Sequence, residues 1–282
     1  MRKIYFVIFL SIAIISESFA VPNFKQQFSL SSDTDAVRGI NFKPDGKIMY
    51  ITRRITPGNN DDPGRRGFIN QYSLSTAFDI STATLISTTQ LTEPGETDGT
   101  FAFLPHAIEF KPDGTRMFVI KNTGTQVYQY DLSTPWNVST ISFSAKYNVS
   151  GEEQLRSLNF KPDGSRMYVT GSEFEKIKEY SLSTPWDVTT SNVTHVRDSA
   201  ALTSTDNNPR NIQFSERGTE LYYAGNGSND MHKFTLSTAW DVSTLSSSAT
   251  AFDLGTRITD MRGFIFTSSF SRLYVTNDGG DA

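Results

Sequence analysis

The sequence predicts an all-β fold, a β-propeller of four-stranded antiparallel blades, from three observations. First, a Phe-Lys-Pro-Asp-Gly segment or a weaker copy of it recurs along the chain, beginning at Phe42, Phe110, Phe160, Phe214 and Phe266. Second, these copies lie roughly 50 to 70 residues apart, a spacing typical of repeat architectures. Third, polar and apolar residues alternate within each copy, which indicates strands. Five repeats are visible, and the last one is incomplete.

Each repeat predicts four strands in the same order. Strand a ends at the anchor Phe, and its alternating pattern is clear over residues 38–42, 106–110 and 156–160. A tight turn follows, because Pro presets φ for its first corner and Gly takes the positive φ at its end. Strand b then begins at a Met, strand c covers residues such as 127–132, and strand d covers residues such as 141–147.

A turn of the form Ser-Thr-Pro-Trp-Asp separates strands c and d. Its aromatic residues are Phe78, Trp136, Trp186 and Trp240. Large aromatic side chains contribute much of the buried apolar area in protein cores. We therefore expect these four to pack between blades, because one small blade cannot bury both of its faces alone.

The two ends of the chain leave the blade count open. Residues 24–30 precede the first strand a, where other repeats have strand d, and the last repeat stops where its strand c would begin. Either the N-terminal strand closes a five-bladed ring, leaving the final blade one strand short, or the polypeptide is truncated. Truncation would leave exposed strand edges.

The N-terminus has the pattern of a secretory signal peptide. Arg2 and Lys3 precede an apolar run over residues 4–15, and Ser18 and Ala20 provide small residues for cleavage. The apolar run is short for a membrane-spanning helix, which needs about 20 residues. The sequence thus predicts a signal peptide over 1–20, one propeller domain over 21–282 and a secreted or periplasmic protein without an integral membrane span after cleavage.

Composition excludes several classes of site. The chain has 282 residues, a formal net charge of −4 and no Cys. Thiol catalysis, iron–sulfur ligation and Cys-based zinc sites are therefore excluded. An acidic chain has no overall attraction for nucleic acid. No residue spacing indicates a metal site, and we expect neither a metal nor a cofactor.

Short motifs give a resemblance to a known superfamily. Tyr-Val-Thr-Asn stands at 274–277, and close variants stand at 168–170 and 50–52, each after a turn at the Pro-Asp-Gly position. The chain resembles the YVTN-repeat β-propellers, which include lactonase-like and quinoprotein-like members. That resemblance implies lactone hydrolysis with Arg, His and Glu at the channel mouth. Pro209-Arg210 is similar to the Pro-Arg-His segment of the lactonase-like members, but Asn211 occupies the His position.

One repeat position gives the candidate site. Four residues before the anchor Phe stand Arg38, His106, Arg156, Arg210 and Arg262. Strand a is the innermost strand of a blade, so symmetry predicts a basic ring at one channel mouth. Such a ring would bind carboxylate or phosphate, which Arg contacts in bidentate fashion. In the alternative, each Arg is a structural residue paired with a nearby acid: Asp35, Glu153, Asp206 or Asp260.

Three functional hypotheses follow. The first is an exported, non-enzymatic binding module that recognises an anionic small molecule, a glycan or a protein at the channel mouth. The second is a lactonase-like hydrolase of cyclic esters, in which Glu109 on strand a is a substitute acid or base. The third is a structural or adhesion repeat protein. No catalytic residue and no oligomeric state follow from the sequence.

Overall fold

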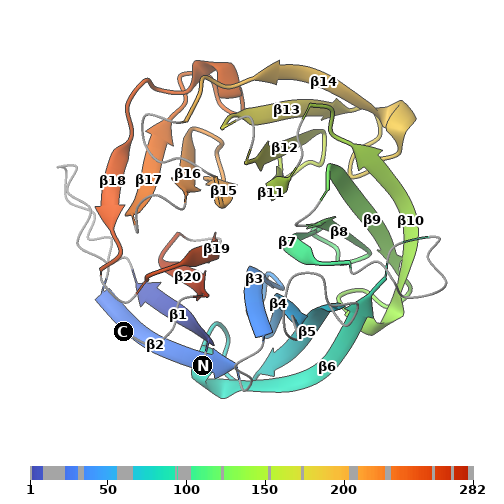
Figure 1. Ribbon diagram of the computed structural model, residues 1–282, viewed down its shortest axis with the longest axis vertical. Coiled ribbons are helices and arrows are strands. Elements are labelled where there is room, and N and C mark those ends of the chain that lie inside the picture. Colours follow the sequence, from blue (N-terminus) through green and yellow to red (C-terminus); the bar gives the residue numbers. More distant parts are fainter. Residues whose placement is uncertain are drawn as a thin grey trace.

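A computed structural model shows five four-stranded antiparallel sheets arranged around a central channel (Figure 1). It describes residues 2–8, 23–30, 35–55, 66–92, 94, 103–121, 124–151, 154–172, 175–202, 209–225, 230–255, 258–267 and 270–278. The predicted all-β propeller is confirmed, with four complete blades formed by consecutive strands and a fifth repeat that supplies two strands of its own.

The four complete blades follow one another in sequence, each with the predicted order of strands a to d. Blade 1 consists of β3 (Asp35–Phe42), β4 (Ile48–Ile55), β5 (Arg66–Leu74) and β6 (Ala83–Leu91). Blade 2 consists of β7 (Pro105–Phe110), β8 (Arg116–Lys121), β9 (Gln126–Leu132) and β10 (Ile141–Asn148). Blade 3 consists of β11 (Leu155–Phe160), β12 (Arg166–Gly171), β13 (Ile177–Leu182) and β14 (Val193–Asp198). Blade 4 consists of β15 (Asn211–Phe214), β16 (Glu220–Ala224), β17 (Asp230–Thr235) and β18 (Thr250–Asp253).

The fifth sheet joins the two ends of the described chain. Strands β19 (Met261–Phe266) and β20 (Arg272–Asn277) pair with β1 (Arg2–Ile8), which in turn pairs with β2 (Asn23–Leu30). The sequence analysis expected that the last repeat would be incomplete, and it does supply only strands a and b; in the structure Arg2–Ile8 occupies the place of strand c. The signal peptide predicted over 1–20 includes this same strand and stays a prediction, which the intact mass of exported protein would test.

The turns between strands a and b confirm the predicted geometry. Gly46, Gly114, Gly164 and Gly218 all have φ near +70°. The Asp before Gly114 fixes this turn, since Asp113 Oδ1 accepts a hydrogen bond of 2.9 Å from the backbone N–H of Thr115. An aromatic ring covers the glycine: a Cβ placed on Gly114 would lie 2.3 Å from the indole nitrogen of Trp136. These turns therefore require Gly both for its φ and for its size.

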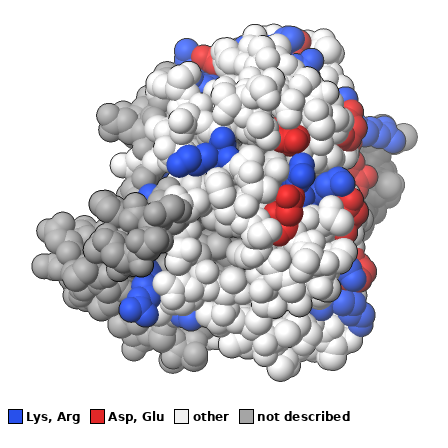
Figure 2. Space-filling model, turned by 90° about the vertical axis from the view of Figure 1, so that its right-hand side faces the viewer, with Lys and Arg blue, Asp and Glu red and all other residues white. Residues whose placement is uncertain are grey.

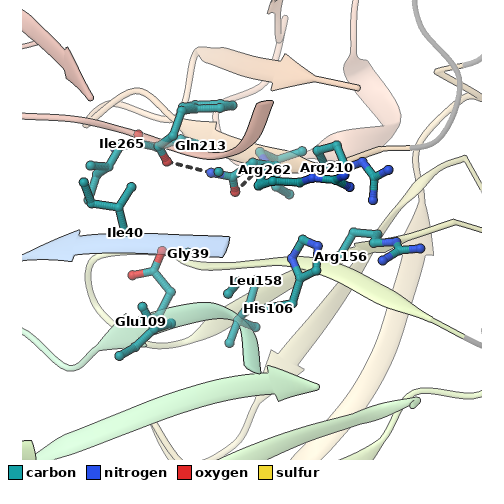
Figure 3. Close-up of a pocket in the computed structure, with 16 residues that line it drawn as sticks. Gly39, Ile40, His106, Glu109, Arg156, Leu158, Arg210, Gln213, Arg262 and Ile265 are labelled. Carbon is teal, nitrogen blue, oxygen red and sulfur yellow. Dashed lines mark hydrogen bonds between the residues drawn. The ribbon is translucent and has the colours of Figure 1, made fainter. Parts of the chain in front are cut away.

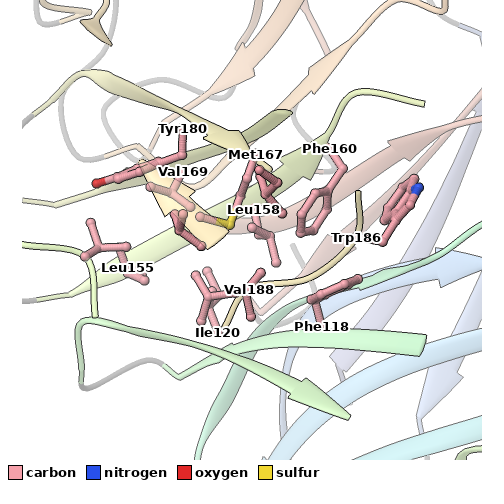
Figure 4. Close-up of a cluster of buried hydrophobic side chains, with 14 residues drawn as sticks. Phe118, Ile120, Leu155, Leu158, Phe160, Met167, Val169, Tyr180, Trp186 and Val188 are labelled. Atoms are coloured by element: carbon pink, nitrogen blue, oxygen red, sulfur yellow. The ribbon is translucent and has the colours of Figure 1, made fainter. Parts of the chain in front are cut away.

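The core lies between blades rather than within them. The aromatic residue that follows the Met or Leu near the start of strand b packs on the anchor Phe of the next blade, with ring centroids 4.5 or 4.6 Å apart. The five pairs are Tyr50–Phe110, Phe118–Phe160, Tyr168–Phe214, Tyr222–Phe266 and Tyr274–Phe42. Figure 4 shows the cluster between blades 2 and 3, where Trp186 packs beside Phe160. The predicted packing of the aromatic turn residues is thus confirmed.

Four very short 3₁₀ helices follow the aromatic turns: η1 (Ile80–Thr82), η2 (Val138–Thr140), η3 (Thr190–Asn192) and η4 (Val242–Thr244). Within the described part of the chain, no helix has the length and apolar character needed to cross a membrane. In side view, positive and negative side chains lie interspersed along one edge of the molecule (Figure 2). The strands nearest the channel are β3, β7, β11, β15 and β19, so their side chains decide what the channel can bind (Figure 1).

Candidate functional site

The structure brings the five predicted ring residues together at one end of the channel. His106, Arg156, Arg210 and Arg262 line a single pocket, whose labelled side chains are drawn in Figure 3. Arg38 lies beside this pocket, and its positive charge acts on both His106 and Arg262. All five are well shielded, because Arg38, His106, Arg156 and Arg210 are less than a tenth exposed and the Arg262 side chain is 18% exposed.

A β-bulge in strand a aims these residues into the channel. In β7, Pro105 pairs with Lys121 and Ile108 pairs with Val119, so three steps on one strand match two on the other. Equivalent register shifts occur in β3, β11 and β19, at or beside the ring position. Side chains alternate between the two faces of a regular strand. The residue four positions before the anchor Phe and the residue one position before it would therefore point in opposite directions. One extra residue allows both positions to face the channel.

Two of these bulges are stabilised by hydrogen bonds from threonines of the Tyr-Val-Thr motif or its Tyr-Ile-Thr variant. Thr52 Oγ1 accepts a hydrogen bond of 2.7 Å from the Gly39 N–H and donates one of 3.0 Å to the His106 carbonyl in the next blade. Thr276 Oγ1 donates to the Arg38 carbonyl across the seam between blades 5 and 1. The backbones approach closely here, because a Cβ on Gly39 would lie 2.6 Å from the His106 carbonyl oxygen. Position 39, which follows Arg38 as Asn211 follows Arg210, therefore has no room for the side chain of a His.

Part of the ring is neutralised by carboxylates. Arg38 Nη1 donates to Asp278 Oδ2 at 2.6 Å, and Arg262 Nε lies 3.6 Å from the same oxygen. Arg262 also pairs with Asp260. The alternative prediction of Arg–acid pairs is thus correct for Asp260, whereas the partner of Arg38 is Asp278, which the sequence analysis did not name. Residues 153 and 206 lie outside the described residues, as does the side chain of residue 35.

In the other half of the ring, neighbouring positive charges act on Arg210 and His106. Arg156 Nη2 donates to Gln154 Oε1 at 2.5 Å. Burial, and then the neighbouring Arg262 and Arg156 charges, lower the pKa of Arg210 to about 9. The pKa of His106 lies well below its usual value because of burial and the surrounding guanidinium groups, so this imidazole is neutral. Within the described residues, no hydrogen-bond partner reaches His106 Nε2 or Arg210 Nε.

A second polar layer lies deeper in the channel, one residue before the anchor Phe. Its polar members are Asn41, Glu109, Asn159 and Gln213, and Ile265 stands at the same position in the fifth blade. Glu109 Oε2 accepts a hydrogen bond from Asn41 Nδ2 and Glu109 Oε1 accepts one from Asn159 Nδ2, both at 3.2 Å. Burial raises the pKa of Glu109 to about 7, although these amide donors oppose the shift. The sequence analysis treated Glu109 as a minor candidate; aligning the repeats at this position would have revealed the polar layer.

Both layers line the same cavity. Its volume is about 20 Å³, and its lining extends from the arginines to Glu109 and Gln213. Figure 3 shows Arg156 and Arg210 at one end and Glu109 at the other. Within the described residues, no group of three or more His, Asp or Glu side chains is arranged to hold a metal ion.

The fold and its basic channel mouth define a β-propeller with a polar central pocket. Residues 65–278 match the family model described as "Lactonase, 7-bladed beta-propeller", and the chain belongs to this family. The resemblance inferred from the Tyr-Val-Thr-Asn motif is thereby confirmed. No match was found among curated proteins.

Similar solved structures share the fold at low identity. A Lactobacillus plantarum protein is 16% identical with a TM-score of 0.54, and the match covers 98% of this chain and 89% of that one. A Bacteroides fragilis protein proposed to be a 6-phosphogluconolactonase is 12% identical with a TM-score of 0.53, covering 97% and 87%. A protein of the same proposed function from Bacteroides uniformis is 16% identical with a TM-score of 0.49, covering 81% of this chain. This chain spans only 61% of its length.

Proposed function

We propose that this lactonase-family propeller binds a small organic anion, a carboxylate or a phosphate, at the mouth of its central channel. The proposal places this binding in a secreted or periplasmic protein, on the strength of the signal-peptide pattern over residues 1–20. The small size of the pocket favours a small anion over a glycan chain or a protein surface.

The observation that carries the proposal is the crowding of positive charge. Four guanidinium groups converge on the mouth, and burial, followed by the Arg262 and Arg156 charges, lowers the pKa of Arg210. Shielded like charges repel one another strongly because little water screens them. An anion bound beside Arg156 and Arg210 would relieve that repulsion, and planar guanidinium groups match the geometry of carboxylate and phosphate.

Thermal stability tests this proposal directly. Citrate or phosphate should raise the melting temperature at constant ionic strength, whereas glucose should not. A ligand that binds only the folded state at a hundredfold excess over Kd stabilises it by about 2.7 kcal/mol. The double variant Arg156→Ala/Arg210→Ala should lose most of this response, while the surface variant Lys111→Ala should retain it. If the anion raises the melting temperature equally in all three proteins, or not at all in the wild type, the ring residues would have a structural role rather than a ligand-binding one.

Lactone hydrolysis is a second candidate function. The match to the lactonase family and the raised pKa of Glu109 in the channel both favour it. With a pKa near 7, Glu109 is partly ionised at neutral pH and could accept a proton from an attacking water. The arginines could stabilise the negative charge that develops on the lactone carbonyl oxygen. Asn211 leaves the family's His position without a titratable group, so the proton-transfer role would depend on Glu109.

Proton release from δ-valerolactone or gluconolactone at constant pH tests the hydrolase reading. We expect a rate above spontaneous hydrolysis in the wild type, reduced at least tenfold in Glu109→Gln. If the wild-type protein does not accelerate ring opening of either lactone, this candidate fails and anion binding without catalysis stands alone.

A further inference from the structure

The pocket beneath the basic ring is much smaller than an organic ligand. Its volume is about 20 Å³, and a cavity needs about 10–15 Å³ to hold one water molecule. The enclosed part of the channel therefore has room for a water or for one monatomic ion. A larger anion, such as citrate or phosphate, would contact the ring from the mouth of the channel.

Two side chains that line this pocket leave a buried nitrogen atom without a partner. His106 is 1% exposed and Arg210 is 7% exposed. Within the described residues, no hydrogen-bond partner reaches His106 Nε2 or Arg210 Nε. The His106 ring points toward the side of the pocket where Arg210 and Arg262 lie (Figure 3). A buried polar atom that stays unpaired costs free energy, so a small ligand between these two nitrogens would stabilise the channel.

The charge around the pocket favours an anion over a water or a cation. The positive charges of all four ring arginines act on His106, whose imidazole is neutral. Carboxylates offset part of this charge at two other members of the ring. A guanidinium nitrogen can only donate, and a neutral imidazole donates from one of its two nitrogens. A water would bring hydrogen atoms of its own to these donors, whereas an anion only accepts.

We propose that this pocket is a binding site for one chloride ion, which accepts hydrogen bonds from His106 Nε2 and Arg210 Nε. The inference rests on the basic ring of the proposed function, but it concerns the enclosed pocket and not the larger anion at the mouth. It also assigns the proton of the His106 imidazole to Nε2. Because His106 lies on β7 and Arg210 directly precedes β15, the ion would link blades 2 and 4 across the channel.

The carboxyl group of Glu109 does not take the place of the ion. Its two oxygens accept hydrogen bonds from Asn41 and Asn159. In Figure 3, Glu109 lies at the opposite end of the pocket from Arg210. The positive end of the pocket is thus left for an ion from solution.

A crystal structure of the full chain, grown with bromide in place of chloride, tests the site directly. Bromide scatters X-rays anomalously, whereas water does not. We expect an anomalous peak within hydrogen-bond distance of both His106 Nε2 and Arg210 Nε. If the anomalous map has no peak there, the pocket contains a water and the proposal is overturned. This measurement uses the wild type and does not depend on the folding of a variant.

Broadening of the chloride resonance in nuclear magnetic resonance spectra tests binding in solution, with methanesulfonate used to keep the ionic strength constant. We expect the wild type to broaden the line and bromide to reverse the effect. Arg210→Met should lose this broadening, because it removes the charge and the Nε donor. Arg217→Met, on an exposed turn of the same blade, is the matched control and should retain it. Circular dichroism would confirm that both variants fold.

Two results in solution would contradict the proposal. Equal broadening by the wild type and a folded Arg210→Met would mean that chloride binds elsewhere. A bromide peak in the crystal without reversible broadening in solution would mean an adventitious ion only.

The melting experiment with citrate and phosphate separates this inference from the proposed function. If those anions stabilise the protein but both halide tests fail, the ring binds a larger anion at the mouth and the chloride site is overturned. If chloride binds and neither larger anion stabilises the protein, the chloride site stands and the proposed function fails. If no anion binds, both proposals fail together.

Discussion

The two faces of the propeller are built from one repeat but satisfy their polar groups in different ways. On the face with the a–b turns, each turn is closed by its own residues: Lys111 and Asp113 pair at 2.7 Å, and Asp113 also accepts from Thr115. At the channel mouth the contacts are mixed: Arg38 pairs with Asp278, 240 positions away, whereas Arg262 and Arg156 contact residues two positions before them. Local contacts thus close the turn face, while the mouth also depends on a contact between the first and the last blade.

The largest expected effect concerns the turn face. Replacing Gly114 with Val should lower the free energy of unfolding by about 3 kcal/mol or more, because φ is +73° and the new Cβ would overlap Trp136. Gly164→Val should behave alike, since its Cβ would lie 2.1 Å from Trp186 Cδ1. Thr115→Val, next to Gly114, is the matched control and should cost about 1 kcal/mol or less. Equal melting temperatures for the three variants would contradict the assigned turn geometry.

A smaller effect is expected from Glu109, the partly buried carboxyl group of the channel. Because the folded-state pKa of Glu109 is raised to about 7, the protein favours its protonated form. The stability from this preference is fully present below the unfolded pKa, near 4.5, and is lost as pH rises to about 7. Wild type should therefore lose roughly 2 kcal/mol relative to Glu109→Gln over this range. Parallel denaturation curves for the two proteins from pH 4.5 to 8 would show that Glu109 is not perturbed.

The threonines that form hydrogen bonds between neighbouring blades provide the third test. Their hydroxyl groups contact the backbone of strand a beside the ring residues. Thr52→Val removes the hydroxyl contacts to Gly39 and His106 and should cost about 1–2 kcal/mol. It should also weaken the anion-dependent rise in melting temperature, since it releases the bulge that orients His106. Thr89→Val, on an outer strand, is the control and should leave the anion response intact. A loss of stability with an unchanged anion response would limit Thr52 to a structural role.

The smallest effect is expected at an inter-blade hydrogen bond. The Tyr168 hydroxyl donates to the Trp240 carbonyl at 2.8 Å, so Tyr168→Phe should cost about 1 kcal/mol in chemical denaturation. The seam between blades 2 and 3 already has Phe118 at the equivalent position, and there Arg116 Nη1 donates to the Trp186 carbonyl instead, at 2.7 Å. A cost well above 2 kcal/mol would mean that the hydroxyl group does more than bridge two blades.

The sequence alone determined the architecture of the blades, because each of its signals is local and repeated, whereas the closure of the ring was left open. Alternation marked the strands, Pro-Asp-Gly marked turns whose glycines do have positive φ, and the spacing of the anchor Phe residues marked the blades. It also located the five-membered basic ring, since equivalent positions of a repeat occupy equivalent places around a channel.

Tertiary structure decided what the ring residues contact and how they are aimed. The bulges of strand a are set by pairing across strands and by the contacts of Thr52 and Thr276 with the backbone of strand a. The partner of Arg38 is 240 positions away in sequence. Glu109 owes its raised pKa to burial in a channel that exists only once five sheets surround it. Position in a repeat follows from sequence, whereas desolvation and the pairing of charges depend on which blades become neighbours.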